Sequence, residues 1–330
     1  MTDSTPVSEI GERSLIMRLS GILNCGCDPD VHIGSGSDDC AVIDISEEEY
    51  MVITTDMLHR TTDFPLQMTP WQIGWMSAAV NFSDVASMGA RPVGFLSAMG
   101  FSKDTDISFV EGISKGMDDC AKFCGTSVIG GDIDTHDELT ITGTALGKVK
   151  KSELLTRKGA NVGDKVCVTG FAGSAGAALH AILNDIEAPE SLLNKLLTPI
   201  PRVNEAMELA RSGAVTCMMD TSDGLAMSLH DLADLNGVGF RIDEASLPIQ
   251  PEISEYITSD ATTLTELALY TGGDFELLFT VAPDMLEAAQ SACYLNVIGD
   301  VVEGELGTVI KCRSGQNLTI NRKGYLQLGD

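Results

Sequence analysis

The segment from Asn81 to Pro92 restricts how the chain around it can fold. Its small residues allow a helix to lie close to a neighbouring backbone, so Asp84 is expected in a tight, half-buried position. The preceding residues 71–80 predict the body of this helix, with apolar side chains on more than one side. An ionised carboxylate in such surroundings needs a cation. A capping or turn role is the alternative, and it is the more usual one for a single aspartate.

Aspartates recur at four other points where apolar runs predict the beginning or end of a strand. These points are Asp38–Asp39, Thr54–Asp56, Gly130–Asp132 and Asp220–Asp223. Oxygen ligands presented at the edge of a sheet are hard ligands, and such ligands suit magnesium. Ordinary turns are the alternative, because Asp is a common turn residue. Together with Asp84, these points favour a clustered divalent-metal site over five unrelated turns.

The length of 330 residues fits two domains better than one. We place the boundary in the polar, glycine-containing linker 150–164, so residues 1–150 form the first domain and residues 151–330 the second. An apolar content of 44% with 33 Gly and 11 Pro is typical of a globular α/β protein. The net charge of −27 opposes binding to nucleic acid or to an anionic membrane.

Nine cysteines are scattered along the chain without the spacing of a zinc site. Two close pairs occur, at Cys25 and Cys27 and at Cys120 and Cys124. We interpret all nine as reduced thiols of a cytoplasmic protein. The first residues lack the pattern of a signal peptide, and no apolar run approaches the length that spans a bilayer.

The apolar periodicity predicts alternating helices and strands in both halves of the chain. Helices are expected over residues 8–23, 71–88, 107–124, 201–212 and 225–235, and strands over 41–45, 50–54, 93–100, 127–129, 138–149, 165–170, 215–219 and 276–281. Residues 28–36 are expected to form a loop. The glycine-rich turn Gly170–Gly176 matches neither a dinucleotide fingerprint nor a P-loop, so it is interpreted as a tight strand-to-helix connection.

The run Asp220–Leu225 opens the helix expected over 225–235, and Ser222 is a plausible N-cap for it. Capping explains one carboxylate but not both. Free backbone N–H groups at a helix N-terminus favour anions, so Asp220 and Asp223 are placed to reach a metal–phosphate group there.

Taken together, these motifs resemble those of the thiamine-monophosphate kinases, in order and over nearly the whole chain. The matching segments are Ser37–Ala41, Thr54–Asp56, Asn81–Pro92, Gly130–Asp132, Leu155–Asp164, Asp220–Leu225 and Asp274–Phe279. That family belongs to the superfamily of aminoimidazole ribonucleotide synthetase and selenophosphate synthetase. The resemblance implies a two-domain PurM-like fold of the α/β (α+β) class, with an N-terminal mixed sheet carrying helices on one face and pairing into a homodimer. The implied reaction converts ATP and thiamine monophosphate to ADP and thiamine diphosphate.

The same resemblance implies roles for individual residues. The implied magnesium ligands are Asp39, Thr54, Thr55, Asp56, Asp84, Asp132, Asp220 and Asp223, and the implied ATP contacts are Gly131, Asp132, Arg157 and Ser222. Implied substrate contacts are Asp63, Asp274 and Tyr325. No side chain is assigned as a catalytic acid or base, because a phosphate monoester with a second pKa of about 6 is already largely ionised at neutral pH. Transfer then depends on positioning and on neutralising charge with several magnesium ions.

Three positions depart from the family pattern. The chain has Ser37 before Asp38–Asp39 where the family has Gly, Asp63 where it has His, and Thr271–Asp274 where it has Gly-Gly-Glu-Asp. The last two positions usually contact the substrate. Two alternative functions are another ATP-dependent member of the superfamily and a non-catalytic nucleotide-binding regulator. The first alternative includes a selenophosphate synthetase or an aminoimidazole ribonucleotide synthetase; the former usually has a reactive Cys or selenocysteine in a glycine-rich N-terminal loop, and Cys25–Cys27 lacks that context.

Overall fold

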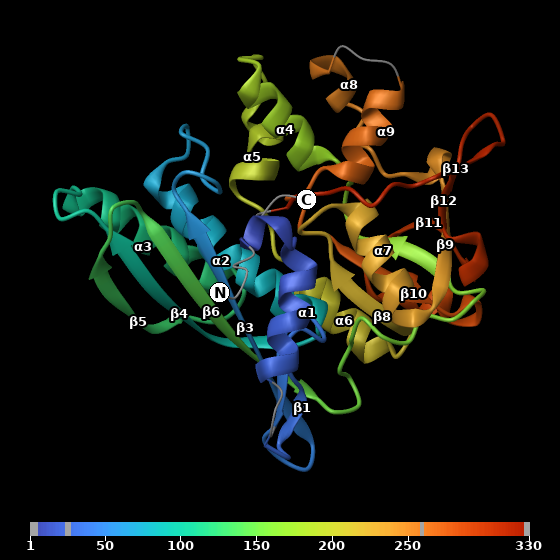
Figure 1. Cartoon of the computed structure of the whole chain (residues 1–330), viewed down its shortest axis with the longest axis horizontal. Coiled ribbons are helices and arrows are strands. Elements are labelled where there is room, and N and C mark those ends of the chain that lie inside the picture. Colours follow the sequence, from blue (N-terminus) through green and yellow to red (C-terminus); the bar gives the residue numbers. More distant parts are fainter. Residues whose placement is uncertain (1–5, 24–27, 258–260, 327–330) are drawn as a thin grey trace, which may run out of the picture.

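The computed structural model describes residues 6–23, 28–257 and 261–326, so Cys25 and Cys27 lie outside the described residues. Each half of the chain forms one β-sheet, and the two sheets lie side by side with helices around and between them (Figure 1). The fold is therefore α/β, as the sequence predicted.

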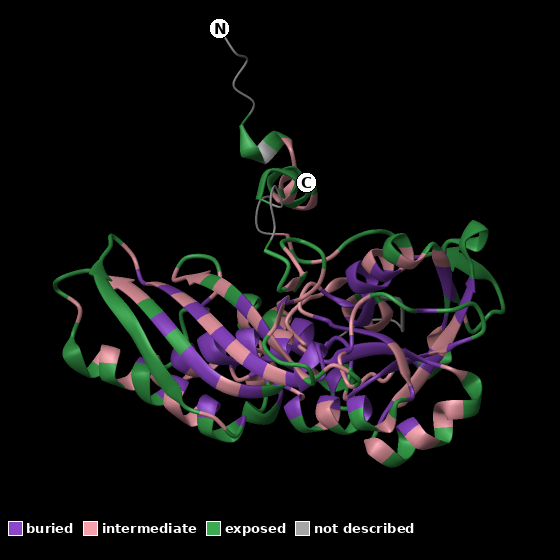
Figure 2. Ribbon diagram, turned by 90° about the horizontal axis from the view of Figure 1, so that it is seen from below, coloured by how far each residue is buried: buried purple, intermediate pink, exposed green. Residues whose placement is uncertain are grey.

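The first sheet has six strands in the order β1-β2-β3-β6-β4-β5. Its members are β1 (Val31–Ile33), β2 (Ala41–Asp44), β3 (Glu49–His59), β4 (Arg91–Phe101), β5 (Val128–Thr135) and β6 (Thr140–Lys150). Only β4 and β5 pair in parallel among these strands, so the sheet is mixed. Helices α2 (Pro70–Ser87) and α3 (Ile107–Phe123) cover one face, and Figure 2 shows no described element over the other. The predicted mixed sheet with helices on one face is confirmed.

The second sheet has seven strands in the order β13-β12-β9-β11-β7-β10-β8. These are β7 (Lys165–Val168), β8 (Val215–Asp220), β9 (Val238–Asp243), β10 (Leu277–Val281), β11 (Asn296–Glu303), β12 (Thr308–Lys311) and β13 (Asn317–Thr319). Its helices are α4 (Ser174–Leu183), α5 (Glu190–Leu197), α6 (Val203–Ser212), α7 (Leu225–Asn236), α8 (Ile253–Tyr256), α9 (Ala261–Tyr270) and α10 (Leu286–Ala292). Together the helices give this half its α/β character.

Helix α2 has clear start signals in its local sequence. Thr69 and Gln72 form a reciprocal capping box, and Pro70 occupies the first helical position, where its missing N–H costs nothing. Gly74 lets α2 approach α3 closely, because a Cβ at that position would meet the carbonyl oxygen of Ile113 at 1.8 Å. This packing fixes the axis of α2 and, with it, the position of Asp84.

One hydrophobic core joins the two halves. It contains Phe82 and Phe95 from the first half together with Leu209 and Phe279 from the second. The indole N–H of Trp75 also donates to a carbonyl of the second half, that of Pro199, at 2.7 Å. Burial of apolar surface across the junction therefore holds the two sheets in a fixed relation.

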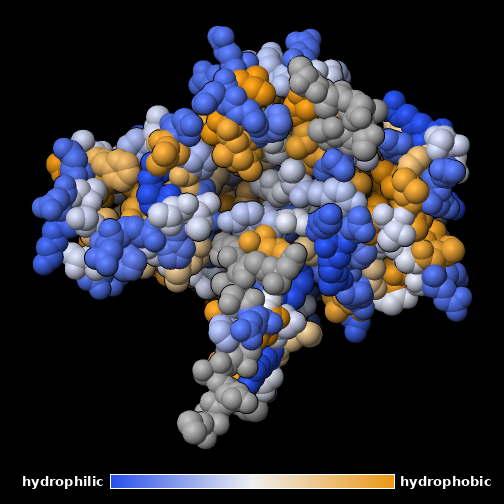
Figure 3. Space-filling model, turned by 45° about the horizontal axis from the view of Figure 1, so that its top comes forward, coloured by the Kyte–Doolittle hydropathy of each residue, from blue (hydrophilic) through white to orange (hydrophobic). Residues whose placement is uncertain are grey.

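Helix α1 (Glu12–Leu23) differs from the others because none of its residues is buried. Figure 2 shows it standing out from the body, and Figure 3 shows the same projection with patches of apolar surface. The sequence predicted a helix from residue 8. Instead a 3₁₀ turn, η1 (Val7–Glu9), comes first, and Gly11 with a φ of 76° interrupts the helical backbone before Glu12.

Three sequence-based boundaries were wrong. Strand β1 lies inside the expected loop 28–36. Strands β3 and β5 extend beyond the apolar runs that predicted them, so Asp56 and Asp132 lie within strands and not at their ends. Polar residues of β3 and β5 belong to the sheet because these strands pair with β6 and β4, and apolar periodicity cannot predict such pairing. No described helix has the length and apolarity needed to cross a membrane.

Candidate metal and phosphate site

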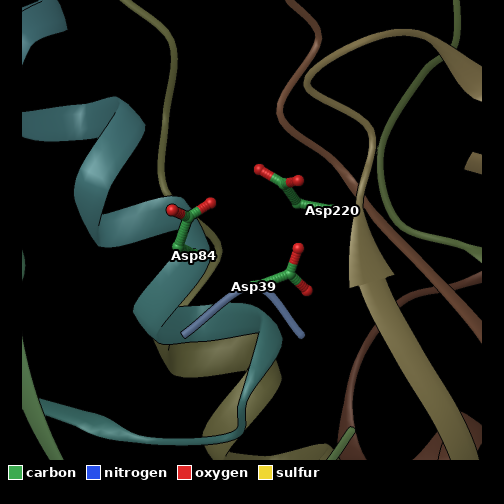
Figure 4. A group of neighbouring side chains, drawn as sticks. All are labelled: Asp39, Asp84 and Asp220. Atoms are coloured by element: carbon green, nitrogen blue, oxygen red, sulfur yellow. The ribbon is translucent and has the colours of Figure 1, made fainter. Parts of the chain in front are cut away.

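Three aspartates from distant parts of the chain meet at the junction between the two sheets. Asp39 precedes β2, Asp84 lies on α2 and Asp220 ends β8, and they bring carboxylate oxygens within 4.8 Å of one another. We call these three residues the carboxylate cluster. In Figure 4 their side chains extend into a common space from three separate elements.

Each member of the carboxylate cluster accepts a hydrogen bond from a nearby hydroxyl group. Thr54 donates to Asp84 at 2.6 Å, and Ser83 donates to Asp220 at 2.5 Å. Ser87 donates to Asp39 at 2.8 Å. These bonds orient the carboxylates but do not neutralise their charge, so the cluster keeps a strong demand for a cation.

Burial and mutual repulsion make full ionisation of this site costly. Burial, followed by the charge of Asp39, raises the pKa of Asp220 to about 7. Burial and the charges of Asp56, Asp220 and Asp39 also raise the pKa of Asp84 well above its usual value. A divalent cation would remove this repulsion, because carboxylate oxygens are the ligands that hard cations prefer.

Asp56 adds a further oxygen donor on the strand beside α2. Burial, followed by the charges of Asp39 and Asp223, raises the pKa of Asp56 to about 6. Its Oδ2 atom is buried and has no hydrogen-bond partner among the described residues. An unsatisfied buried carboxylate oxygen fits a metal ligand better than a structural residue. The residues present therefore fit magnesium.

Arg157 brings a positive charge to the same place. Its Nε donates to Asp39 at 3.0 Å, and its Nη2 makes a second contact with the same oxygen. Burial alone would lower the pKa of Arg157, but the charge and hydrogen bond of Asp39 more than offset this and raise it. Arg157 is a permanent cation bound to one of the three carboxylates, so it is placed to bind a phosphate group.

Asp38, for which the resemblance implied no role, has a structural one. Its carboxylate accepts the backbone N–H of Arg157 at 3.1 Å and that of Asp39 at 3.0 Å. Burial and the charge of Asp39 raise the pKa of Asp38 to about 7. Asp38 therefore ties the segment that carries Arg157 to the loop that carries Asp39. The Asp-Asp doublet was the available signal, but its long-range partner could not be read from it.

The turn between β8 and α7 differs from its prediction. Gly224, with a φ of 102°, is the N-cap of α7, so the prediction that Ser222 caps this helix was wrong. The side chain of Asp223 contacts Arg13 of α1 at 3.3 Å. Sequence reasoning missed Arg13 entirely, because 210 positions separate the two residues.

Two of the predicted substrate residues contact each other. The hydroxyl of Tyr325 donates to Asp63 at 3.2 Å, and the backbone N–H of Tyr325 donates to the carbonyl of Asp223 at 3.0 Å. Burial and the charge of Asp63 raise the pKa of Tyr325 to about 12. The C-terminal segment thus runs beside Asp223, while 43% of Tyr325 remains exposed.

The third predicted substrate residue, Asp274, binds the start of α4. Its carboxylate accepts the backbone N–H groups of Gly173 at 2.6 Å and Ala175 at 2.8 Å. Burial raises the pKa of Asp274 to about 7 against these hydrogen bonds. The adjoining Phe275 has a φ of 50°, a conformation that is rare for a bulky residue. Asp274 thus helps to fix a constrained loop.

Strand register separates the remaining predicted residues. Asp132 is in register with Ala98, and Thr55 donates its hydroxyl to the carbonyl of Gly143 at 2.7 Å. Both lie on the face of the sheet opposite to Asp56, because successive side chains of a strand alternate. Gly131 lies directly across the sheet from Asp56, through the register partners Gly143 and Ser97. Three strand spacings, or about 14 Å, separate the two residues. The described chain alone therefore does not bring Thr55, Gly131 or Asp132 to the carboxylate cluster.

Comparisons with known proteins match most of the chain to related proteins. The family model described as AIR synthase related protein, N-terminal domain, matches residues 37–149, and the corresponding C-terminal domain matches residues 161–311. A thiamine-monophosphate kinase of Methanospirillum hungatei is 39% identical over 290 residues, which cover 88% of this chain and 92% of the relative. One from Archaeoglobus fulgidus is 38% identical, covering 81% of this chain and 83% of the relative. The solved structure of AaThiL complexed with AMPPCP and TMP matches with a TM-score of 0.85 at 27% identity, covering 99% of this chain and 100% of that one.

Proposed function

The chain belongs to the thiamine-monophosphate kinase family, and from that premise we propose that it phosphorylates thiamine monophosphate to thiamine diphosphate with ATP. The observation that carries the proposal is the carboxylate cluster. It occurs in a chain that matches thiamine-monophosphate kinases over most of their length. In the reaction, the bond between the γ-phosphorus of ATP and its bridging oxygen breaks. A new bond forms to an oxygen of the acceptor phosphate, and ADP leaves.

No side chain has to remove a proton in this reaction. The acceptor is a phosphate monoester with a second pKa of about 6, so most of it is already dianionic at neutral pH. The difficulty is to bring two polyanions together in line. Bound magnesium would supply the positive charge that screens their repulsion. The carboxylate cluster would hold that metal, while Arg157 would bind a phosphate oxygen of ATP.

We assign the individual contacts as the family resemblance implies them; the geometry of a single chain supports those at the carboxylate cluster, whereas the assignments of Thr55, Gly131 and Asp132 rest on the resemblance alone. The magnesium ligands are Asp39, Thr54, Thr55, Asp56, Asp84, Asp132, Asp220 and Asp223, and ATP is contacted by Gly131, Asp132, Arg157 and Ser222. The buried, unpartnered Oδ2 of Asp56 and the close approach of the three carboxylates support the metal assignments. Asp63, Asp274 and Tyr325 are assigned to thiamine monophosphate, and the contact between Tyr325 and Asp63 supports placing it near the C-terminal segment.

We also propose that residues 1–150 form the ATP- and magnesium-binding domain, which pairs with a second copy, and that residues 151–330 form the C-terminal α/β domain. The uncovered face of the first sheet supports pairing, because Met57 is 52% and Leu96 36% exposed there. Apolar side chains gathered on a sheet face favour burial against another surface.

A cytoplasmic location is part of the same proposal. Seven cysteines are described, and all seven are free thiols, five of them buried. Free thiols persist in a reducing compartment, where ATP is also available as a substrate.

A single turnover assay tests the proposed function. Purified protein with ATP, magnesium chloride and thiamine monophosphate should produce thiamine diphosphate and ADP in equal amounts. Omission of magnesium or addition of a chelator should stop both products. ADP formation that needs the substrate of a selenophosphate synthetase or of an aminoimidazole ribonucleotide synthetase, with none from thiamine monophosphate, would move the protein to another branch of the superfamily. Nucleotide binding without turnover of any acceptor would favour the regulator.

A further inference from the structure

Arg13 on α1 is held by one aspartate and contacts another. Its Nε donates to Asp231 Oδ1 at 3.0 Å, and its Nη2 donates to Asp231 Oδ2 at 2.6 Å. The same Nη2 reaches Asp223 Oδ2 at 3.3 Å. Such a two-point contact between a guanidinium and a carboxylate fixes the plane of the arginine, so the position of Arg13 is set by Asp231.

Asp223 keeps one carboxylate oxygen available. Its Oδ2 accepts from Arg13, whereas its Oδ1 has no hydrogen-bond partner among the residues that the structure describes. Asp223 lies three positions after Asp220, which ends β8 and is a member of the carboxylate cluster. Its charge is also one of those that raise the pKa of Asp56, which places it within electrostatic reach of the metal site.

Helix α1 spans the two sides of this site. Near its middle, the side chains of Ile16 and Ser20 lie against Gly36, where an added Cβ would come within 3.1 Å of Ile16. Gly36 stands three positions before Asp39. At its N-terminal end, Arg13 binds the turn and helix of the second half through Asp223 and Asp231. No residue of α1 is buried, so contacts such as these help to determine where the helix lies.

We propose that Arg13 is a positioning residue for Asp223: fixed by Asp231, it holds Asp223 Oδ2 and leaves Oδ1 to bind a divalent cation. The identity of that cation as magnesium beside the acceptor phosphate rests on the proposed function. The positioning itself rests only on the contacts of Arg13. Through this contact, α1 joins the loop of Asp39 to the turn of Asp223 and helps to complete the metal site.

The two possible roles of Arg13, as a positive charge or as a positioning residue, predict opposite changes in divalent-cation affinity when Arg13 is replaced. If Arg13 acted only as a positive charge near the metal, Arg13→Gln would remove repulsion, and the divalent cation would bind more tightly. If Arg13 holds Asp223 in place, the same change frees the carboxylate, and binding weakens by roughly tenfold, as is typical when a residue supporting a metal ligand is lost. The direction of the change therefore separates the two roles.

The test uses the full-length protein without nucleotide or thiamine monophosphate. Manganese is titrated as the probe, and the free ion is followed by electron paramagnetic resonance. We expect Arg13→Gln and Asp231→Asn each to weaken the lowest-affinity class of bound manganese. The double variant should be no weaker than either single variant, because both remove the same constraint. Arg13→Lys keeps the charge but lacks the planar fork, so it should restore only part of the affinity.

Arg241→Gln is the matched control. It removes one cation from an ion pair with Asp300 at 2.8 Å, in a part of the second sheet remote from the carboxylate cluster, and should leave manganese binding unchanged. Unchanged or tighter binding in Arg13→Gln, with a native circular dichroism spectrum, overturns the proposal. Should Arg13→Gln fail to fold, Asp231→Asn decides by the same criterion.

Kinetics then connect the inference to the reaction. In Arg13→Gln we expect a higher KM for thiamine monophosphate and a nearly unchanged KM for ATP, since Asp223 lies beside the Tyr325 segment. If wild-type protein makes no thiamine diphosphate, the proposed function fails, yet the manganese titration still decides the role of Arg13. If wild-type protein is active but manganese binding does not respond to Arg13→Gln, only the positioning role fails.

Discussion

The hydroxyl of Ser83 donates a 2.5 Å hydrogen bond to the carboxylate of Asp220, across 137 positions of sequence. Ser83 lies on α2 and Asp220 ends β8, and both side chains are buried. The bond therefore joins the two halves of the molecule directly beside the carboxylate cluster. Asp84, the next residue on α2, reaches the same cluster, so one turn of helix both fixes the junction and contributes to the site.

Ser83→Ala should show what this bond contributes. Loss of the hydroxyl donor leaves the buried carboxylate of Asp220 without this hydrogen bond, which should lower the free energy of unfolding by about 1–3 kcal/mol. Loss of orientation at Asp220 should lower turnover by roughly tenfold. Urea unfolding and steady-state kinetics measure the two effects. Ser114→Ala, which removes an exposed hydroxyl from α3, is the control and should change neither. Wild-type turnover in Ser83→Ala would mean that Asp220 does not depend on this bond.

Asp84→Asn should reduce turnover by orders of magnitude while the protein still folds. The substitution keeps the shape of the side chain and removes one charge from the carboxylate cluster, so metal and metal-bound nucleotide are held less well. Calorimetry should show weaker magnesium-dependent ATP binding. Asp284→Asn, at an exposed position, is the matched control. Near-normal activity in Asp84→Asn would remove the carboxylate cluster from the mechanism.

Tyr325→Ala should raise the KM for thiamine monophosphate and leave that for ATP nearly unchanged. The thiazolium ring is a cation, and its attraction to an aromatic face is worth about 0.5–2 kcal/mol, or roughly 2- to 30-fold in affinity. Tyr325→Phe keeps the ring but removes the hydrogen bond to Asp63, so it should have a smaller effect. The assignment fails if the KM for ATP alone responds, or if neither constant changes.

Light scattering at micromolar concentration should give twice the chain mass of 35.0 kDa. Met57→Asp places a charge on the uncovered face of the first sheet and should shift the protein toward the monomer. Leu183→Asp, at a residue of α4 that is 72% exposed, adds the same charge elsewhere and should leave the mass unchanged. A wild-type protein that runs as a clean monomer contradicts the pairing proposed for this face.

Asp274 should make the metal-free protein less stable as the pH rises. Burial raises its pKa to about 7 in the folded chain, above the usual value of about 4 for an aspartate, so folding favours the protonated form. Its contribution is fully present below about pH 4 and is lost as the pH rises through 7, by about 4 kcal/mol at most. Urea unfolding in a chelator should therefore show a steeper decline from pH 4.5 to 7.5 for wild type than for Asp274→Asn. Parallel curves would show that Asp274 ionises as readily in the folded chain as in the unfolded one.

Local sequence determined much of the architecture. Helix α2 was predictable because Thr69, Pro70 and Gln72 specify its start and an apolar run follows them. The motifs around Asp39, Asp84 and Asp220 also predicted a shared site, and the three carboxylates do meet. The start of α2 and each aspartate motif consist of residues close together in the chain, so they can be recognised without knowledge of their distant partners.

Tertiary structure alone decided which faces and which partners these residues have. Thr55 and Asp56 point to opposite faces of the sheet because both lie within β3, where side chains alternate, and no local pattern marked where β3 would end. Asp38, Asp220 and Asp223 each have a hydrogen-bond partner that is more than 100 positions away. Such contacts exist only once packing of α2 against both halves has brought the elements together, because a local pattern specifies an element and not its neighbour in space.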